Sequence, residues 1–98
     1  MRKRRNIPTV PVDFFTDGDH KDKYSRILYQ SILDGVEQSL KTNKDSFVMA
    51  RIEDGKVIRD IEILKDSFKS NLETVLTYYE ETEEYEKCSH TLNLINRI

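Results

Sequence analysis

The sequence predicts a small α+β domain: one helix, a two-stranded β-hairpin and a C-terminal helical hairpin, preceded by an extended basic arm. Three observations support this class. Apolar residues recur every three or four positions in residues 23–41 and again in residues 67–97, as in amphipathic helices. Two segments with alternating apolar residues lie between these stretches. They flank Asp54 and Gly55, a pair favoured in tight β-hairpin turns.

Length and charge favour one domain with a basic arm attached to an acidic body. The 98 residues suffice for a single core. We place this core in residues 16–98, after an arm of residues 1–15. The net charge is −2, but four of the sixteen basic residues are adjacent: Arg2, Lys3, Arg4 and Arg5. Without these four the chain has twelve basic residues against eighteen acidic ones, a balance of −6.

Cysteine content and hydropathy indicate the compartment. A single cysteine, Cys88, excludes an internal disulfide framework and fits a reducing compartment. No apolar run approaches the ~18 residues of a membrane span, and no apolar region of the kind found in secretory signals follows the charged start. We therefore expect a cytoplasmic protein that does not contact a membrane.

The arm should be extended, because Pro8 and Pro11 fix their own φ and disfavour helix in the residues before them. Its basic cluster could neutralise the phosphates of a nucleic acid, with an affinity that falls as salt rises. The alternatives are a solvated terminus and an arm that docks on the acidic residues 80–86. The apolar residues available to anchor the arm are Val10, Val12, Phe14 and Phe15. We favour an anchoring edge strand or plug, because adjacent phenylalanines are costly to leave in water.

The first helix is predicted over residues 23–41, where one broad face is apolar. This face comprises Tyr24, Ile27, Leu28, Ile32, Val36 and Leu40, and it is widened by Tyr29 and Leu33. Gly35 weakens such a helix by ~1 kcal/mol relative to alanine. Two interpretations of this glycine stay open: it allows a neighbouring helix to approach closely, or it is simply tolerated.

The β-hairpin is predicted over residues 46–63. If Asp54 and Gly55 form a type I′ loop, Ile52 lies opposite Val57, Ala50 opposite Arg59, and Val48 opposite Ile61. That register gathers the apolar residues on one face: Val48, Ala50, Ile52, Val57 and Ile61. A hairpin alone is marginal in water, so we expect this face to pack on the helices.

The C-terminal region is predicted to be two helices, residues 67–80 and 83–97. Two apolar stripes support this division: Phe68, Leu72, Val75, Leu76 and Tyr79, then Tyr85, Cys88, Leu92 and Ile95. The stripes are out of phase, which indicates a break between Glu80 and Glu84. Thr82 could then cap the second helix, whose positive end would favour the glutamates around it. One long helix with a stutter is the alternative, because no Gly or Pro marks the turn.

The acidic start of this last helix resembles the UVR helical-hairpin domain, which joins subunits B and C of the bacterial excision-repair nuclease and recurs in protein-quality-control adaptors. The residues that match its pattern are Tyr85, Glu86, Cys88, Ser89 and Ile95. Thr91 stands where that domain usually has a leucine, with Leu92 one place later. The resemblance covers about a quarter of the chain. It implies a protein-contact surface, and such hairpins also occur in small bacterial and phage proteins.

Motifs for catalysis or cofactor binding are absent from the sequence: no glycine-rich phosphate loop, HExxH, nucleophile elbow or CxxC pair occurs. Asp13, Asp17 and Asp19 only faintly suggest a calcium loop, because position twelve would be Tyr24 or Leu28 instead of glutamate. Cys88 and His90 are two apart on a predicted helix, so they point in different directions. We therefore expect no metal, no cofactor and no enzymatic activity.

The expected function is a protein-protein interaction module, acting as an adaptor, regulator or assembly component of bacterial or phage origin. The residues expected at the contact are Tyr78, Tyr79, Glu81, Glu84 and Tyr85. Aromatic anchors with a charged rim suit such a surface, although the same tyrosines could belong to the core. Self-association into a homo-oligomer would use the same apolar stripes. The alternative function is a nucleic-acid-associated factor that binds through Arg2, Lys3, Arg4 and Arg5.

Overall fold

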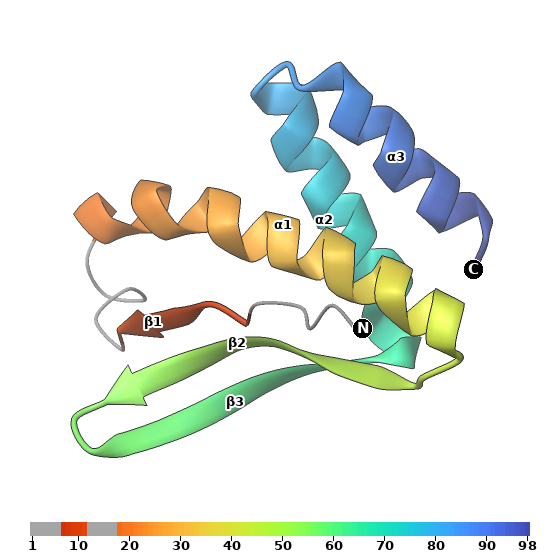
Figure 1. Ribbon diagram of the computed structural model, residues 1–98. Helices are drawn as coiled ribbons and strands as arrows, with labels where there is room; N and C mark the ends of the chain where they lie inside the picture. Colours follow the sequence, from red (N-terminus) through yellow and green to blue (C-terminus); the bar gives the residue numbers. More distant parts are fainter. Residues whose placement is uncertain (1–6, 12–17) are drawn as a thin grey trace, which may run out of the picture.

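The α+β class is confirmed by a computed structural model, which describes residues 7–11 and 18–98 (Figure 1). Its elements are β1 (Thr9–Pro11), α1 (Gly18–Thr42), β2 (Ser46–Asp54), β3 (Val57–Leu64), a 3-10 turn (Lys65–Ser67), α2 (Phe68–Glu81) and α3 (Tyr85–Asn96). Helix α1 lies between two layers: the three-stranded sheet covers one side, and the α2–α3 hairpin crosses the other. The helical hairpin is thus held away from most of the sheet, with α1 as its support.

Strand β1 confirms that part of the arm forms an edge strand. It pairs in parallel with β2, with Thr9 opposite Arg51 and Pro11 opposite Glu53, and the sheet order is β1-β2-β3. Val10 is buried against the underside of α1, where it packs with Leu28 and Ala50. The prolines fit here because an edge strand needs only some of its N–H groups for pairing. The other residues of the arm for which a role was predicted lie outside the described residues, as does Asp17 just after the arm: Arg2, Lys3, Arg4, Arg5, Val12, Asp13, Phe14 and Phe15.

The turn of the β-hairpin lies one residue later than predicted. Asp54 pairs with Val57, so the loop is Gly55 and Lys56, and the predicted loop of Asp54 and Gly55 is wrong. Gly55 has a φ of 62°, while Lys56 does not have a positive φ. Positive φ at the first loop residue alone is the pattern of a type II′ turn, which needs glycine there. The Asp-Gly signal therefore located the turn but not its type.

The register of the hairpin is changed further by an irregularity at Met49. Beyond it Val48 lies opposite Glu62, and Ala50 lies opposite Ile61. Because side chains alternate along β3, Glu62 and Val48 face away from Ile61, so the predicted shared face is wrong at Val48. Val57 is exposed and contributes nothing to the core. The hairpin residues that pack against the helices are Phe47, Met49, Ala50, Ile52 and Ile63.

Helix α1 is longer than predicted, starting at Gly18 and ending at Thr42. Asn43 follows with a φ of 57°, and the N–H of Lys44 donates to the carbonyl of Ser39 over 2.9 Å, as in a Schellman motif. Gly35 is buried, and a Cβ placed there would overlap the ring of Phe47. The close approach that glycine permits is therefore that of β2, and not that of a neighbouring helix.

The main core lies where α2 and α3 meet α1. Its buried residues are Ile32, Leu33, Val36, Phe68, Leu72, Val75, Tyr79, Cys88 and Leu94. Phe47 from the sheet extends this core, with its ring centroid 5.6 Å from that of Phe68. Burial of these side chains supplies the main driving force for docking the helical hairpin on α1.

Candidate functional site

The turn between α2 and α3 confirms the predicted break between Glu80 and Glu84. Thr82 ends α2, and Glu83 takes a φ of 58°, in the left-handed region. The N–H of Glu84 donates to the carbonyl of Tyr79 over 2.9 Å, and that of Glu83 donates to Glu80 over 3.2 Å. These two bonds form a Schellman motif. A non-glycine residue thus makes the turn, which explains why no Gly or Pro marks it in the sequence.

The predicted capping role of Thr82 is wrong. Glu84 is the N-cap residue of α3, and its carbonyl accepts hydrogen bonds from the N–H groups of Lys87 and Cys88, both over 3.1 Å. No side chain caps the first turn of α3. Thr82 is instead the C-cap of α2, because the Schellman motif needs two further residues before the next helix can start.

A cluster of four polar side chains fixes this turn to α1, and we call it the Glu84 clasp: Arg26, Thr82, Glu84 and Lys87. The Arg26 guanidinium donates to Glu84 Oε1 over 2.6 Å, and the Thr82 hydroxyl donates to Glu84 Oε2 over 2.6 Å. Lys87 Nζ lies 3.5 Å from Glu84 Oε1 and 5.2 Å from the centre of the Tyr79 ring. The clasp joins residues 58 positions apart, so only the tertiary structure brings it together.

The clasp shifts the ionisation of its members. The hydrogen bond from Thr82, followed by the hydrogen bond and charge of Arg26, lowers the pKa of Glu84 from its usual 4.5 to about 2. The same contact with Glu84 raises the pKa of Arg26. Glu84 is therefore a charged structural contact at neutral pH, and its carboxylate already has partners from within the chain.

Tyr79 and Tyr78 belong to the packing of the hairpin. Tyr79 is fully buried, and its hydroxyl donates to Gln30 Oε1 over 3.1 Å. Burial, followed by the charge of Glu84, raises the pKa of Tyr79 to about 12. Tyr78 is half-buried, with its ring centroid 4.4 Å from that of Tyr29 on α1. The buried hydroxyl of Tyr79 thus has a hydrogen-bond partner within the protein, as buried tyrosines usually do.

The five residues predicted to contact a partner thus have different surroundings. Tyr79 is in the core and cannot touch another molecule, and Tyr78 offers only part of its ring. Glu84 is held in the clasp. Glu81 and Tyr85 are exposed, with 67% of Tyr85 accessible to solvent. Tyr85 and Glu81 are the two that the turn presents outward.

Helix α3 carries a second exposed apolar residue, Leu92, which was not among the predicted contact residues. Leu92 is 46% exposed, although it was grouped with Cys88 and Ile95 in one stripe. Tyr85 and Leu92 are seven positions apart and so lie on one side of the helix. We call this side the α3 outer face; it comprises Tyr85, Ser89, Leu92 and Asn96, all exposed.

Thr91, which lies outside the predicted stripe, takes a core position on α3. Thr91 is fully buried, and its hydroxyl donates to the carbonyl of Lys87 over 2.7 Å. That bond satisfies the hydroxyl within the helix, so a polar residue costs little there. Cys88 is also buried, and burial raises the pKa of its thiol, which leaves it a structural residue. The signal available in the sequence was Thr91 itself, because a threonine can be buried in a helix when its hydroxyl bonds to the backbone.

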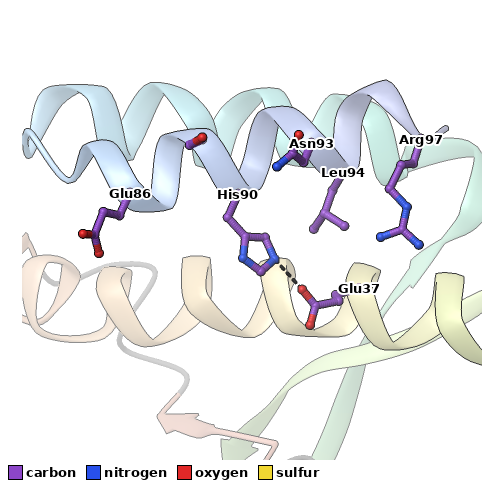
Figure 2. A pocket seen from close by; sticks show the side chains of 7 residues that line it. Glu37, Glu86, His90, Asn93, Leu94 and Arg97 are labelled. Atoms are coloured by element: carbon purple, nitrogen blue, oxygen red, sulfur yellow. Dashed lines mark ion pairs between the residues drawn. The ribbon is translucent and has the colours of Figure 1, made fainter.

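A groove of about 400 Å³ lies between α1 and α3, on the side away from the sheet (Figure 2). In it, His90 of α3 points at Glu37 of α1, and the two side chains form an ion pair when His90 is protonated. Ser89 also lines the groove, but successive helical residues diverge by about 100°, so Ser89 and His90 cannot act as a nucleophile and base pair. The groove supplies a second polar tie between α1 and α3.

Among residues 7–11 and 18–98, no group of three or more His, Cys, Asp or Glu side chains is placed to hold a metal ion. No helix in this part of the chain is both long and apolar enough to cross a bilayer. The chain matches no protein-family model, no curated protein and no solved structure.

Proposed function

We propose that this protein is a non-enzymatic interaction module, an adaptor, regulator or assembly component, whose helical hairpin presents the α3 outer face to a partner protein. The observation that carries the proposal is the exposure of Tyr85 and Leu92 on one side of a helix whose other side is core. Tyrosine is one of the residues enriched at the energetic centres of protein interfaces, and Leu92 extends the apolar surface on the same side of the helix.

The helix that carries these anchors is held in place from three directions. Leu94 inserts into the core, the Glu84 clasp fixes the start of α3, and His90 meets Glu37 halfway along it. A partner would therefore meet a surface whose backbone is already ordered. Preorganisation of this kind lowers the entropy cost of binding.

The resemblance to the UVR domain supports the same function, because that domain joins proteins to one another. In this chain the matching residues Tyr85 and Ser89 lie on the α3 outer face, while Cys88 packs inward. We therefore assign to the outer face the contact role that the resemblance implies for the hairpin.

Site-specific photo-crosslinking tests the proposal directly. The full chain carrying a benzophenone amino acid at position 85 is irradiated in native extract, and covalent adducts are resolved by mass. A matched chain carries the same group at Lys56, an exposed loop residue of the β-hairpin. We expect a discrete protein adduct from position 85 only, competed by wild-type protein but not by a Leu92→Ala variant. No adduct at position 85, or the same adduct from both positions, would contradict the proposal.

A further inference from the structure

The two ends of α3 differ in the charge near them. Within five residues of Tyr85 in the sequence, at the end of α2 and the start of α3, the exposed glutamates are Glu80, Glu81, Glu83 and Glu86. None of these four forms an ion pair with another residue of the described chain. Within residues 7–11 and 18–98, the apolar anchor at this end is therefore flanked by negative charge that no ion pair neutralises.

The basic side chains on α3 and just after it do not compensate this charge. Lys87 is engaged with Glu84 in the clasp, and His90 points at Glu37 in the groove. Arg97 lies just after the other end of α3. The start of the outer face thus favours a partner that brings cations, and repels one that brings carboxylates.

The side chains between the anchors leave room for a second helix. Ser89 is small, and it lies between Tyr85 and Leu92 on the outer face. Anchors at positions i and i+7 match the apolar stripe of an amphipathic helix laid alongside. Small residues between such anchors let two helix backbones approach each other.

We propose that the occupant of the α3 outer face is an amphipathic helix of a partner protein, with its apolar stripe on Tyr85 and Leu92 and a cluster of Lys or Arg against Glu81, Glu83 and Glu86. This inference rests on the proposed function and specifies its partner. A second copy of the chain fits less well, because an antiparallel α3 would bring only Arg97 to the acidic end.

Synthetic helices serve as probes of this partner chemistry. Each peptide has about 18 residues, enough to span both anchors, and the same leucine stripe. One carries lysines clustered at one end, a second has glutamine in their place, and a third has glutamate. A fourth has the lysine peptide's composition without its stripe. Binding to the full chain is measured by calorimetry at low and high salt.

We expect the lysine peptide to bind at least about tenfold tighter than the glutamine peptide, and this advantage to shrink at high salt, where exposed charges are screened. The glutamate peptide and the stripeless peptide should not bind. Equal binding of the lysine and glutamine peptides would overturn the basic partner while leaving the interaction module intact. If none of the peptides binds, the proposal that the partner is an amphipathic helix is also overturned. The proposal that the protein is an interaction module is tested separately, by the crosslinking experiment.

Charge-matched variants locate the contact. In the acidic-end variant, Glu81→Gln, Glu83→Gln and Glu86→Gln remove three charges beside Tyr85. The control variant removes three exposed charges on and near the β-hairpin: Glu53→Gln, Asp54→Asn and Asp66→Asn. The acidic-end variant should lose about tenfold in affinity for the lysine peptide and most of the salt dependence, and the control should lose neither. Equal losses in both variants would show that only net charge matters and would overturn the proposal.

The anchors are tested in the same assay. Tyr85→Ala with Leu92→Ala should abolish binding of the lysine peptide, while circular dichroism verifies that the fold is retained. Light scattering of the wild-type protein addresses the second copy. If the wild-type protein is a dimer and the same double substitution makes it monomeric, the α3 outer face binds a second copy of the chain, and the proposal is overturned.

Discussion

The β-hairpin and the helical hairpin both reverse the chain with one residue in the left-handed conformation, but this conformation is stabilised differently in the two turns. Each turn contains one residue in the left-handed region, Gly55 with a φ of 62° and Glu83 with a φ of 58°. Gly55 adopts this conformation at no steric cost, and nothing lies within 4 Å of the place a Cβ would take. Glu83 pays for its conformation, because an L-residue with a side chain disfavours it.

The helical turn is maintained by its surroundings. Glu84, the next residue, is held by Arg26 and Thr82, and the carbonyl of Tyr79 accepts the closing hydrogen bond. The β-turn depends on a local preference, and the helical turn depends on a tertiary arrangement. Substitutions in the two hairpins should therefore change the stability of the protein in different ways.

The largest effect should come from removing the core support of the helical hairpin. Leu94→Ala deletes a side chain that is 2% exposed and should lower the free energy of unfolding by about 2–5 kcal/mol. Leu92→Ala, two residues earlier on the outer face, should change it by less than about 0.5 kcal/mol. Urea denaturation of both variants measures the difference. Similar values for the two leucines would mean that α3 is not packed as described.

The second largest effect on stability should come from changing the packing of β2 against α1 at Gly35. Gly35→Ala places a methyl group where the Phe47 ring lies, and overpacking of this kind costs about 1–3 kcal/mol. The better helix propensity of alanine offsets up to about 1 kcal/mol of that cost. Adding Phe47→Ala should make the Gly35→Ala substitution neutral or favourable, so that the double-mutant cycle is strongly non-additive. If the changes in unfolding free energy of the two substitutions were additive, the Phe47 ring would not lie against position 35 as described.

The turns themselves should give opposite signs. Gly55→Ala forces an alanine into the left-handed region and should cost about 1 kcal/mol. Glu83→Gly removes the same penalty from the helical turn and should add up to about 1 kcal/mol, because glycine is the usual residue at that position of a Schellman motif. Thermal unfolding of both variants beside the wild type provides the test. A loss of stability in Glu83→Gly would show that its side chain has a role of its own.

The smallest effect on stability should come from the Glu84 clasp, and it should depend on pH. The pKa of Glu84 is depressed from 4.5 to about 2, so its contribution to stability is complete above pH 4.5 and is lost as the pH falls through 2. Glu84→Gln should thus be less stable than the wild type at neutral pH, with a difference that narrows between pH 4.5 and 2. Denaturation curves across this range measure it. Glu81→Gln, an exposed glutamate outside the clasp, is the control and should show no such narrowing.

Much of the architecture could be predicted from periodicity. The break between the last two helices followed from two stripes that were out of phase, and the β-hairpin followed from alternation around Gly55. The register failed at Val48 because an irregularity at Met49 inserts a residue into one strand, and a pattern of period two cannot show such an insertion. The turn type failed because both type I′ and type II′ accept a glycine.

The candidate surface was only partly predictable. Tyr85 was predicted as a contact residue and is exposed. Leu92 was not among the predicted contact residues but is exposed, whereas Tyr79, predicted at the contact with the core as its alternative, is fully buried. Helical periodicity defines a stripe to within a residue or two, and the direction of a neighbouring helix decides which edge of that stripe is buried. Thr91 could replace a leucine in the core because its hydroxyl bonds within the helix.

By itself the sequence determined the order of elements, the acidic character of the last turn and the place where the chain reverses, since these depend on local composition and spacing. The tertiary structure alone decided which aromatic residues stay accessible. It also decided that Glu84 meets Arg26 and that His90 meets Glu37. The reason is that such contacts join residues more than fifty positions apart, and their geometry is set by how the helices pack on α1.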